Sequence, residues 1–317
     1  MRVLLPLPDR DFDVTEVAVP WAILREAGHE VVFATEKAGT VPAADPRLLT
    51  GVLFGRLGAA PEARKRYFEL VVQAPEFGAT AGWADLDPDG FDGLILPGGH
   101  APGMRQYLGS PVLSEQVARF WRLNRPVGAI CHGVLVLART RDPATGRSVL
   151  AGRRTTCLPK YMERSAYLAT AWRLGRYYRT YPAYVEDEVR AALEPEGRFE
   201  RGPVTLSARG TAADDRPAFV VRDRNYVSAR WPGDAYLFGR AFRDLLESRS
   251  LSRTDRVTRP SVRAQPQPAA LSSQPSARSS QPRRGPARLP HAPRLLHASH
   301  ERGSRHYRGS LHPLWRV

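Results

Sequence analysis

The chain has 317 residues, of which 42% are hydrophobic, and its formal net charge is +15. Residues 251–317 carry a net charge of +11 and leave only +4 for residues 1–250, so the charge does not indicate nucleic-acid binding by the body of the chain. The two cysteines, Cys131 and Cys157, exclude a disulfide framework, and neither has the Cys and His spacing that is typical of a metal site.

We therefore expect a reducing, cytoplasmic location, no metal and no other cofactor. The apolar run at the N-terminus is too short for a signal peptide. No run in the sequence approaches the ~18 apolar residues that span a membrane. The length suits one large α/β domain, which we place at residues 1–248.

The first 35 residues predict a βαβ unit. Residues 3–7 are apolar throughout, which is typical of a strand buried on both faces. Residues 16–27 follow as a helix that Thr15 caps and Gly28 ends, and residues 30–35 form a second strand. A helix between two strands predicts that the strands are parallel.

Residues 36–90 interrupt this alternation. Two helical patterns within residues 48–72 predict a helical cap that is inserted into the domain. The alternation then resumes with a strand at residues 91–96, a helix at 111–124 and a strand at 126–130. These elements extend the predicted parallel sheet.

The elements beyond residue 138 are shorter. In chain order we predict a strand pair near residues 149–150 and 154–158, helices at 161–174 and 186–193, a hairpin of residues 219–222 and 226–230, and a closing helix at 232–247. Residues 249–317 are rich in Arg, Pro and Ser and poor in clustered apolar side chains, so we predict a disordered tail. Two interpretations of the tail stay open: a basic arm in weak contact with nucleic acid, and an extension without function.

The stretch RPVGAICHGVLVL at residues 125–137 predicts a buried strand, a sharp turn and a helix. Cys131 lies on the turn and Gly133 allows it to be tight. A cysteine in this place is typical of a nucleophile elbow, and the start of the helix favours a thiolate and a lowered pKa of the thiol. A small buried core cysteine explains the same pattern, so the stretch alone leaves both interpretations open.

Three motifs together resemble the ThiJ/PfpI superfamily, which has a class I glutamine amidotransferase-like fold. They are Glu16 followed by VAVPWAILREAG, then LILPGGHAPG at residues 94–103, and VGAICHG at residues 127–133. The resemblance is strongest to the heat-shock chaperone/glyoxalase III branch and to the PfpI-type hydrolases. It implies a flavodoxin-like, doubly wound parallel sheet with a nucleophile elbow.

The resemblance also implies a set of catalytic residues. Cys131 matches the family nucleophile, and His132 matches the histidine that follows it. Glu16 matches the acidic residue that lies near the thiol. A carboxylate about thirty residues downstream orients the histidine in that branch, and Glu163 is the nearest fit to it.

The predicted substrate residues follow the strand at residues 91–96. The backbone N–H groups of Gly99 and His132 match the family's oxyanion-hole donors, and Gly98 belongs to the same turn. Because ligands of parallel sheets bind beyond the carboxyl ends of the strands, we expect His100 and Arg105 to line the pocket.

We therefore expect a cofactor-free cysteine enzyme that acts on a small carbonyl or amide compound, as a glyoxalase III-like lyase or hydratase or as a deglycase, and that forms a homodimer. Two alternatives stay open. One is a PfpI-like cysteine peptidase or amidase. The other is a non-enzymatic stress chaperone or a redox sensor in which Cys131 is oxidised. We interpret Cys157 as structural, because nothing beside it in the sequence activates a thiol.

Overall fold

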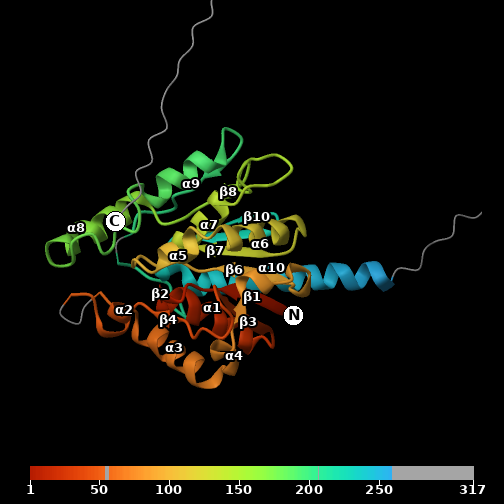
Figure 1. The fold of residues 1–317 in the computed structure, drawn as a ribbon, viewed down its shortest axis with the longest axis horizontal. Helices are drawn as coiled ribbons and strands as arrows, with labels where there is room; N and C mark the ends of the chain where they lie inside the picture. Colours follow the sequence, from red (N-terminus) through yellow and green to blue (C-terminus); the bar gives the residue numbers. More distant parts are fainter. Residues whose placement is uncertain (54–56, 206, 259–317) are drawn as a thin grey trace, which may run out of the picture. The chain divides into compact units, whose positions relative to one another are not determined.

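The computed structural model describes residues 1–53, 57–205 and 207–258 and is built around a seven-stranded sheet (Figure 1). The strands lie side by side in the order β10 (Val220–Asp223), β11 (Tyr226–Ala229), β7 (Val127–Ile130), β6 (Gly93–Leu96), β1 (Arg2–Pro6), β3 (Glu30–Thr35) and β5 (Ala81–Gly82). Neighbours are parallel except for β10 and β11, which form the predicted antiparallel hairpin. The mostly parallel sheet confirms the predicted flavodoxin-like α/β fold.

The chain reverses its direction across the sheet between β1 and β6. From β1 it passes through α1 (Val14–Glu26) to β3, whereas from β6 it passes through α6 (Pro111–Arg122) to β7, in the opposite direction. Because such crossovers are right-handed, α1 and α6 cover opposite faces of the sheet. Ligands of doubly wound sheets bind beyond the carboxyl ends of the strands at this reversal.

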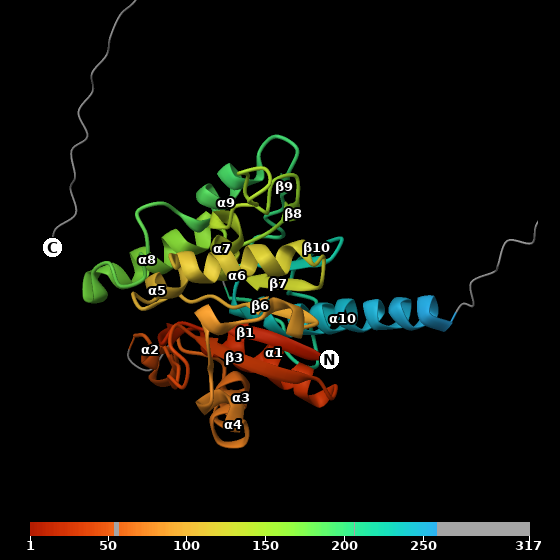
Figure 2. The same ribbon diagram turned by 45° about the vertical axis from the view of Figure 1, so that its right-hand side comes forward.

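Further helices complete the two layers. Helix α10 (Ala235–Thr258) packs against α1, and α7 (Val134–Arg139) packs against α6 and α9 (Val185–Leu193). Three more helices lie near the carboxyl ends of β1 and β6, on the left of Figures 1 and 2: α2 (Pro46–Thr50), α5 (Met104–Leu108) and α8 (Lys160–Leu174).

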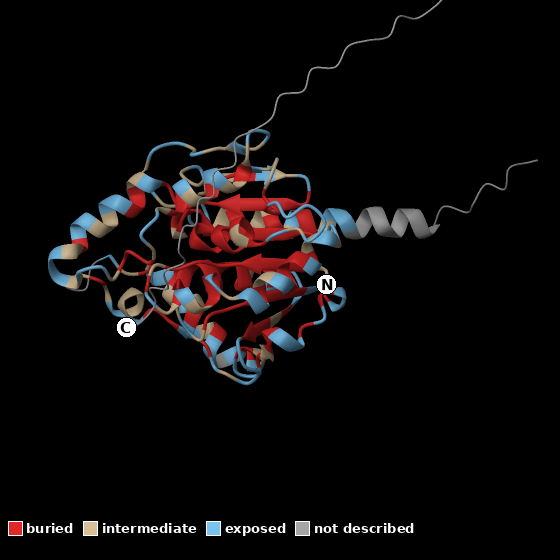
Figure 3. Ribbon diagram, turned by 45° about the horizontal axis from the view of Figure 1, so that its top comes forward, coloured by how far each residue is buried: buried red, intermediate tan, exposed pale blue. Residues whose placement is uncertain are grey.

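The core lies along the central strands, which are buried over nearly their whole length (Figure 3). Strand β7 contains Gly128, where a Cβ atom would lie 2.8 Å from the Phe238 ring of α10. Phe238 and Phe242 are fully buried. The missing side chain therefore lets two aromatic rings lie directly on the sheet, which compensates for the weak strand propensity of glycine.

Helix α1 begins two residues earlier than predicted, and its cap is Asp13 rather than Thr15. The Asp13 carboxylate accepts hydrogen bonds from the backbone N–H groups of Thr15 at 2.8 Å and Glu16 at 3.2 Å. A carboxylate can accept both of these otherwise unpaired donors, which explains why it takes the capping position. The cap also fixes the backbone of Glu16 at the carboxyl end of the sheet.

The inserted segment 36–90 divides into two parts. Strand β4 (Ala43–Ala44) pairs with β2 (Arg10–Phe12), and α2 follows it towards the carboxyl end of the sheet. Helix α3 (Pro61–Gln73) instead packs against α1, so it belongs to a helical layer and not to a cap. The segment closes with α4 (Pro75–Gly78), β5, and two 3-10 turns, η1 (Trp83–Asp85) and η2 (Pro88–Gly90).

Of the strand pair predicted at residues 149–150 and 154–158, only residues 154–155 form a strand, and the predicted pairing is wrong. Strand β8 (Arg154–Thr155) pairs in parallel with β9 (Arg198–Phe199), about 45 residues away along the chain, which local periodicity does not reveal. Turn η4 (Pro232–Asp234) leads into α10, which continues to Thr258, beyond the predicted domain boundary at residue 248. The predicted disordered tail of residues 249–317 is therefore wrong for residues 249–258, which continue the helix. The rest of the predicted tail, residues 259–317, lies outside the described residues. None of the helices in the described part has the length and apolar character to cross a membrane.

Candidate active site

Cys131 lies on a strained turn directly after β7. Its φ angle is +57°, in the left-handed region that residues with a side chain rarely adopt. The 3-10 turn η3 (Cys131–Gly133) follows, and a Cβ atom on Gly133 would collide with the carbonyl oxygen of Leu96 at the end of β6. The close approach explains the glycine. Strain that is held in place by packing is typical of functional sites.

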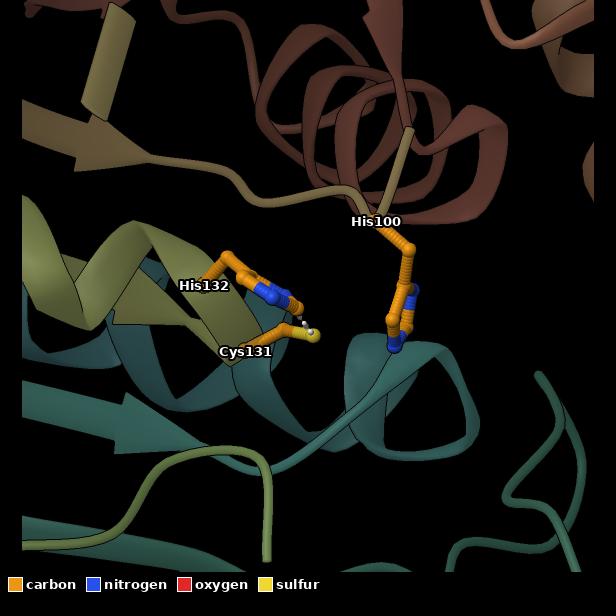
Figure 4. Close-up of side chains that lie close together, drawn as sticks. All are labelled: His100, Cys131 and His132. Carbon is orange, nitrogen blue, oxygen red and sulfur yellow. Dashed lines mark hydrogen bonds between the residues drawn. The ribbon is translucent and has the colours of Figure 1, made fainter. Parts of the chain in front are cut away.

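The strained turn brings two adjacent side chains together. Cys131 Sγ lies 3.6 Å from His132 Nδ1, although neighbouring residues on a regular helix point apart (Figure 4). Glu16, in the first turn of α1, lies beside the thiol and accepts a hydrogen bond from the Gly98 backbone N–H at 2.8 Å. All three side chains are buried. The structure thus places Cys131, His132 and Glu16 next to one another at the reversal point of the sheet.

Thr180, in the loop between α8 and α9, sets the orientation of His132. Its hydroxyl donates a hydrogen bond to the His100 carbonyl at 2.7 Å and lies 3.5 Å from His132 Nε2. Because the single hydroxyl proton is already used, the oxygen can only accept from Nε2–H. This contact leaves the lone pair of Nδ1 facing the thiol of Cys131, as a base requires. No motif in the sequence points to Thr180.

Glu163 does not hold His132, contrary to the prediction. Its carboxylate accepts from Arg179 Nη1 at 2.8 Å and from the Val185 backbone N–H at 3.0 Å. Arg105 does not line the pocket either, because its Nε donates to the Thr180 carbonyl at 2.8 Å. Both residues therefore hold the α8–α9 loop that carries Thr180. Glu163 was predicted from its spacing to Cys131, but its carboxylate contacts the α8–α9 loop and not His132.

In the turn after β6, both backbone polar groups of Gly98 have partners within the protein. The N–H of Gly98 is occupied by Glu16, and its carbonyl accepts from the Asp13 N–H at 2.9 Å. Gly98 therefore positions the acid and does not stabilise an oxyanion. The backbone N–H of His132 is directed at the sulfur of Cys131. The oxyanion role of Gly99 and His132 stays a prediction.

The electrostatics of the site differ from those expected at a helix terminus. Burial raises the pKa of the Cys131 thiol well above its ordinary value, and the neighbouring Glu16 carboxyl raises it further. Burial also raises the pKa of Glu16 and lowers that of His132. The pKa of His100 falls to about 4 for the same reason. The predicted lowering of the thiol pKa is therefore wrong for this closed site, where desolvation outweighs the short helix α7.

A cavity of about 340 Å³ reaches the site at His100. Its walls come from α8, from the α2 segment and from the loop before α10, and they are mostly apolar: Leu48, Val52, Leu158, Met162, Ala166, Ala169 and Trp231. Arg209 lines the same cavity with its guanidinium 5.0 Å from the Trp231 ring. The α2 part of the inserted segment therefore covers this cavity together with α8, as the predicted cap would.

The structure also gathers three metal-binding side chains, which the sequence spacing did not indicate. The ligand atoms of His100, Cys131 and His132 all lie within 4.8 Å of one another. His100 comes from the β6 end and the other two residues from the β7 end, so only the pairing of β6 with β7 brings them together. The His100 and His132 rings meet edge to face, with their centroids 4.7 Å apart.

The fold and the elbow together define a class of flavodoxin-like α/β proteins with a buried cysteine at the carboxyl end of the sheet. A family model described as ThiJ/PfpI family-like matches residues 7–203. The chain belongs to this family, as the three sequence motifs predicted.

Individual relatives are similar over most of their length. "Uncharacterized protein C14C4.04" of Schizosaccharomyces pombe is 31% identical over 253 residues, which cover 78% of this chain and 85% of that protein. "Deglycase PYRAB04690" of Pyrococcus abyssi is 28% identical over 78% of this chain and the whole of the relative. The solved structure of glyoxalase III from Candida albicans has a TM-score of 0.57 and 19% identity, and covers 77% of this chain and 97% of its own.

Proposed function

We propose that the protein is a cofactor-free cysteine enzyme that converts small carbonyl compounds, with 2-oxoaldehydes as the leading substrate class. The observation that carries the proposal is the 3.6 Å contact between Cys131 Sγ and His132 Nδ1, in a buried elbow beside Glu16. A thiol and a base at this distance are the elements of nucleophilic catalysis. Its relatives include a protein named deglycase, which supports carbonyl chemistry in this family.

The reaction begins with addition of the thiol to the aldehyde. The Cys131 S–H proton moves to His132 Nδ1 while a carbon–sulfur bond forms, and the carbonyl electron pair becomes an oxyanion. The oxyanion takes the proton from His132 to give a hemithioacetal. Because the thiol is buried and neutral, proton transfer to His132 accompanies the attack.

The second half of the reaction is an internal redox step that needs no external oxidant. The proton on the former aldehyde carbon moves to the neighbouring carbon, and the hydroxyl proton of the hemithioacetal moves to the neighbouring carbonyl oxygen, with Glu16 and His132 as carriers. The product is a 2-hydroxyacyl thioester. Water then breaks the carbon–sulfur bond and restores the thiol. The balance is one 2-oxoaldehyde and one water to one 2-hydroxy acid.

The cavity supports a small substrate with an apolar substituent. About 340 Å³ is room for a small organic molecule. Its apolar walls suit the alkyl or aryl group of an oxoaldehyde. His100 lines one end of the cavity, and its ligand nitrogen lies within 4.8 Å of Cys131 Sγ.

The test is the formation of lactate from methylglyoxal without glutathione, with matched cysteine variants. Wild type and Cys157→Ser are expected to form lactate at similar rates, whereas Cys131→Ser loses activity by at least about 10³-fold. Equal rates for the two serine variants would remove the proposed nucleophile. Phenylglyoxal, assayed in parallel, shows whether the apolar cavity accepts a larger substituent.

The name of the Pyrococcus abyssi relative favours a second substrate form at the same site. A deglycase acts on adducts that an oxoaldehyde forms with thiols or amines. The same thiol would take the carbonyl carbon from the adduct and release the amine or thiol. Release of free N-acetylcysteine from its methylglyoxal adduct, compared with the rate for free methylglyoxal, separates the two forms.

A further inference from the structure

We propose that His100, Cys131 and His132 form a binding site for a zinc-class divalent cation, with two imidazole ligands, one thiolate ligand and one open coordination position. Zinc accepts this combination of nitrogen and sulfur ligands. Three protein ligands and an open position are typical of sites that exchange their fourth ligand. Zinc binding would occupy the nucleophile and its base together, and would thereby switch the enzyme off.

The distances within the cluster fit a tetrahedral ion. With a Zn–S bond of about 2.3 Å and a Zn–N bond of about 2.0 Å, two ligand atoms of a tetrahedron lie about 3.5 Å apart. Cys131 Sγ and His132 Nδ1 are already 3.6 Å apart. All three ligand atoms lie within 4.8 Å of one another, so His100 completes the site by a small rotation of its ring. Figure 4 shows the His100 ring across from the Cys131 sulfur.

The neighbours of the cluster orient the ligands. Thr180 Oγ1 lies 3.5 Å from His132 Nε2, so it accepts from the ring nitrogen that faces away from the ion and leaves Nδ1 free. A hydrogen bond to the outer nitrogen of a histidine is a common feature of metal sites, where it fixes the ring. The contact that orients His132 as a base therefore also orients it as a ligand.

The charges near the cluster favour a cation on the sulfur side. Glu16 lies beside Cys131, and Asp13 contributes negative charge from the helix cap. Arg139 and Arg179 contribute positive charge near His132 and oppose the ion. Binding releases the thiol proton, since Cys–SH and Zn²⁺ give a zinc thiolate and H⁺. The thiolate and the acid at the Cys131 side then offset the charge of the ion.

The cavity gives the ion a route to the cluster. His100 lines the cavity, whereas Cys131 and His132 are buried behind it. An ion that binds His100 first can pass to the deeper pair. Since substrate approaches the thiol from the same cavity, zinc and substrate are expected to exclude each other. This proposal rests on the ligand cluster and does not require that the oxoaldehyde reaction be correct.

The test uses Co²⁺ as a spectroscopic substitute for zinc in the chelator-treated full-length chain. A tetrahedral cobalt thiolate gives a near-ultraviolet charge-transfer band that only a cysteine ligand can produce. We expect one such site per chain in wild type and in Cys157→Ser, and displacement of the band by Zn²⁺. Cys131→Ser abolishes the band, and His100→Gln weakens Co²⁺ binding by more than about tenfold.

The controls separate this site from other ligands in the chain. Five of the eight histidines lie in residues 259–317, and cobalt bound by histidines alone would give no thiolate band. A band that is absent in wild type, survives Cys131→Ser or disappears in Cys157→Ser would overturn the proposal. Binding that is unaffected by His100→Gln would also overturn it. The spectrum needs no turnover, so an inactive enzyme that still shows the band would refute only the proposed reaction.

Discussion

The two cysteines of this protein share burial but not surroundings. Both thiols are fully buried, and burial together with nearby acids raises the pKa of each. Cys131 has a positive φ angle and an imidazole nitrogen 3.6 Å from its sulfur. Cys157 follows β8, and its sulfur contacts the Leu158 carbonyl at 3.7 Å. Within the described residues, no histidine contacts Cys157.

This comparison shows that exposure and thiol pKa do not identify the reactive cysteine here. A carbonyl oxygen can hold a thiol proton in place but cannot take it away, whereas an unprotonated imidazole nitrogen can. The acidic residues near the two cysteines also differ in whether they are available to the thiol. Glu16 lies against the thiol of Cys131, while Glu163 near Cys157 is bound to Arg179. The two cysteines are therefore distinguished by whether a group that can accept the thiol proton lies beside them.

The largest effect is expected when His132, the proton acceptor beside Cys131, is removed. His132→Ala leaves Cys131 in its elbow but removes the base beside it, so that Cys131 resembles Cys157. We expect kcat for methylglyoxal to fall about 10³-fold, within the range for the loss of a general base. Because the buried ring leaves a cavity, we also expect a lower melting temperature, so the rates are compared at a temperature where both proteins are folded. A variant with full activity would show that the contact with Nδ1 has no catalytic role.

The acid near Cys157 should affect stability more than chemistry. Glu163→Gln breaks a buried ion pair and leaves Arg179 without its carboxylate, so we expect a loss of about 3 kcal/mol of unfolding free energy. Urea unfolding measures it. The pair also holds the loop that carries Thr180, so at temperatures where the variant stays folded kcat should fall by no more than the roughly tenfold expected for loss of the Thr180 contact. A large loss of kcat with unchanged stability would restore the catalytic role that the sequence suggested.

The acid near Cys131 should show the opposite pattern. Glu16→Gln keeps an oxygen that can accept from the Gly98 N–H and removes the carrier of a proton. We expect kcat to fall roughly 10² fold, the lower end for acid–base catalysis, with little change in KM. Steady-state kinetics of this variant are compared with those of Glu163→Gln, because both variants replace a carboxylate by an amide. Equal kcat values for the two variants would contradict the distinction between the sites.

The smallest expected effect belongs to Thr180, which positions His132 from the loop. Thr180→Val keeps the shape and removes the acceptor for Nε2–H, so the ring loses the contact that fixes its tautomer. We expect kcat to fall about tenfold, with KM nearly unchanged. Thr180→Ser should restore most of the activity because it keeps the hydroxyl. Failure of serine to restore activity would indicate a packing role for Thr180.

The sequence predicts the parallel sheet and the elbow because both depend on local patterns. The apolar strands, the glycine at residue 133 and the helix that begins near Glu16 are all legible along the chain. The family resemblance then places Glu16 near Cys131, a contact between segments that are 115 positions apart. These elements form the part of the site that the structure reproduces.

The remaining residues of the site depend on long-range packing that spacing does not encode. Thr180 reaches His132 from a loop that Arg105 and the Glu163–Arg179 pair hold in place. His100 approaches Cys131 only because β6 and β7 are neighbours. The thiol pKa depends on complete desolvation, which outweighs the helix terminus. The sequence motif identifies the residues of the Cys131 turn. The position of the α8–α9 loop beside this turn depends instead on contacts between residues that are far apart in the sequence.

The role of Cys131 as the nucleophile can be tested by peptide mapping of the full-length chain, quenched with acid during turnover of methylglyoxal. Acid preserves a thioester, so mass spectrometry can locate the covalent intermediate. We expect a substrate-derived adduct on the Cys131 peptide that disappears when the substrate is consumed, and no such transient adduct on the Cys157 peptide. Steady turnover with no transient adduct on Cys131, or with equal adducts on both cysteines, would show that Cys131 is not the nucleophile.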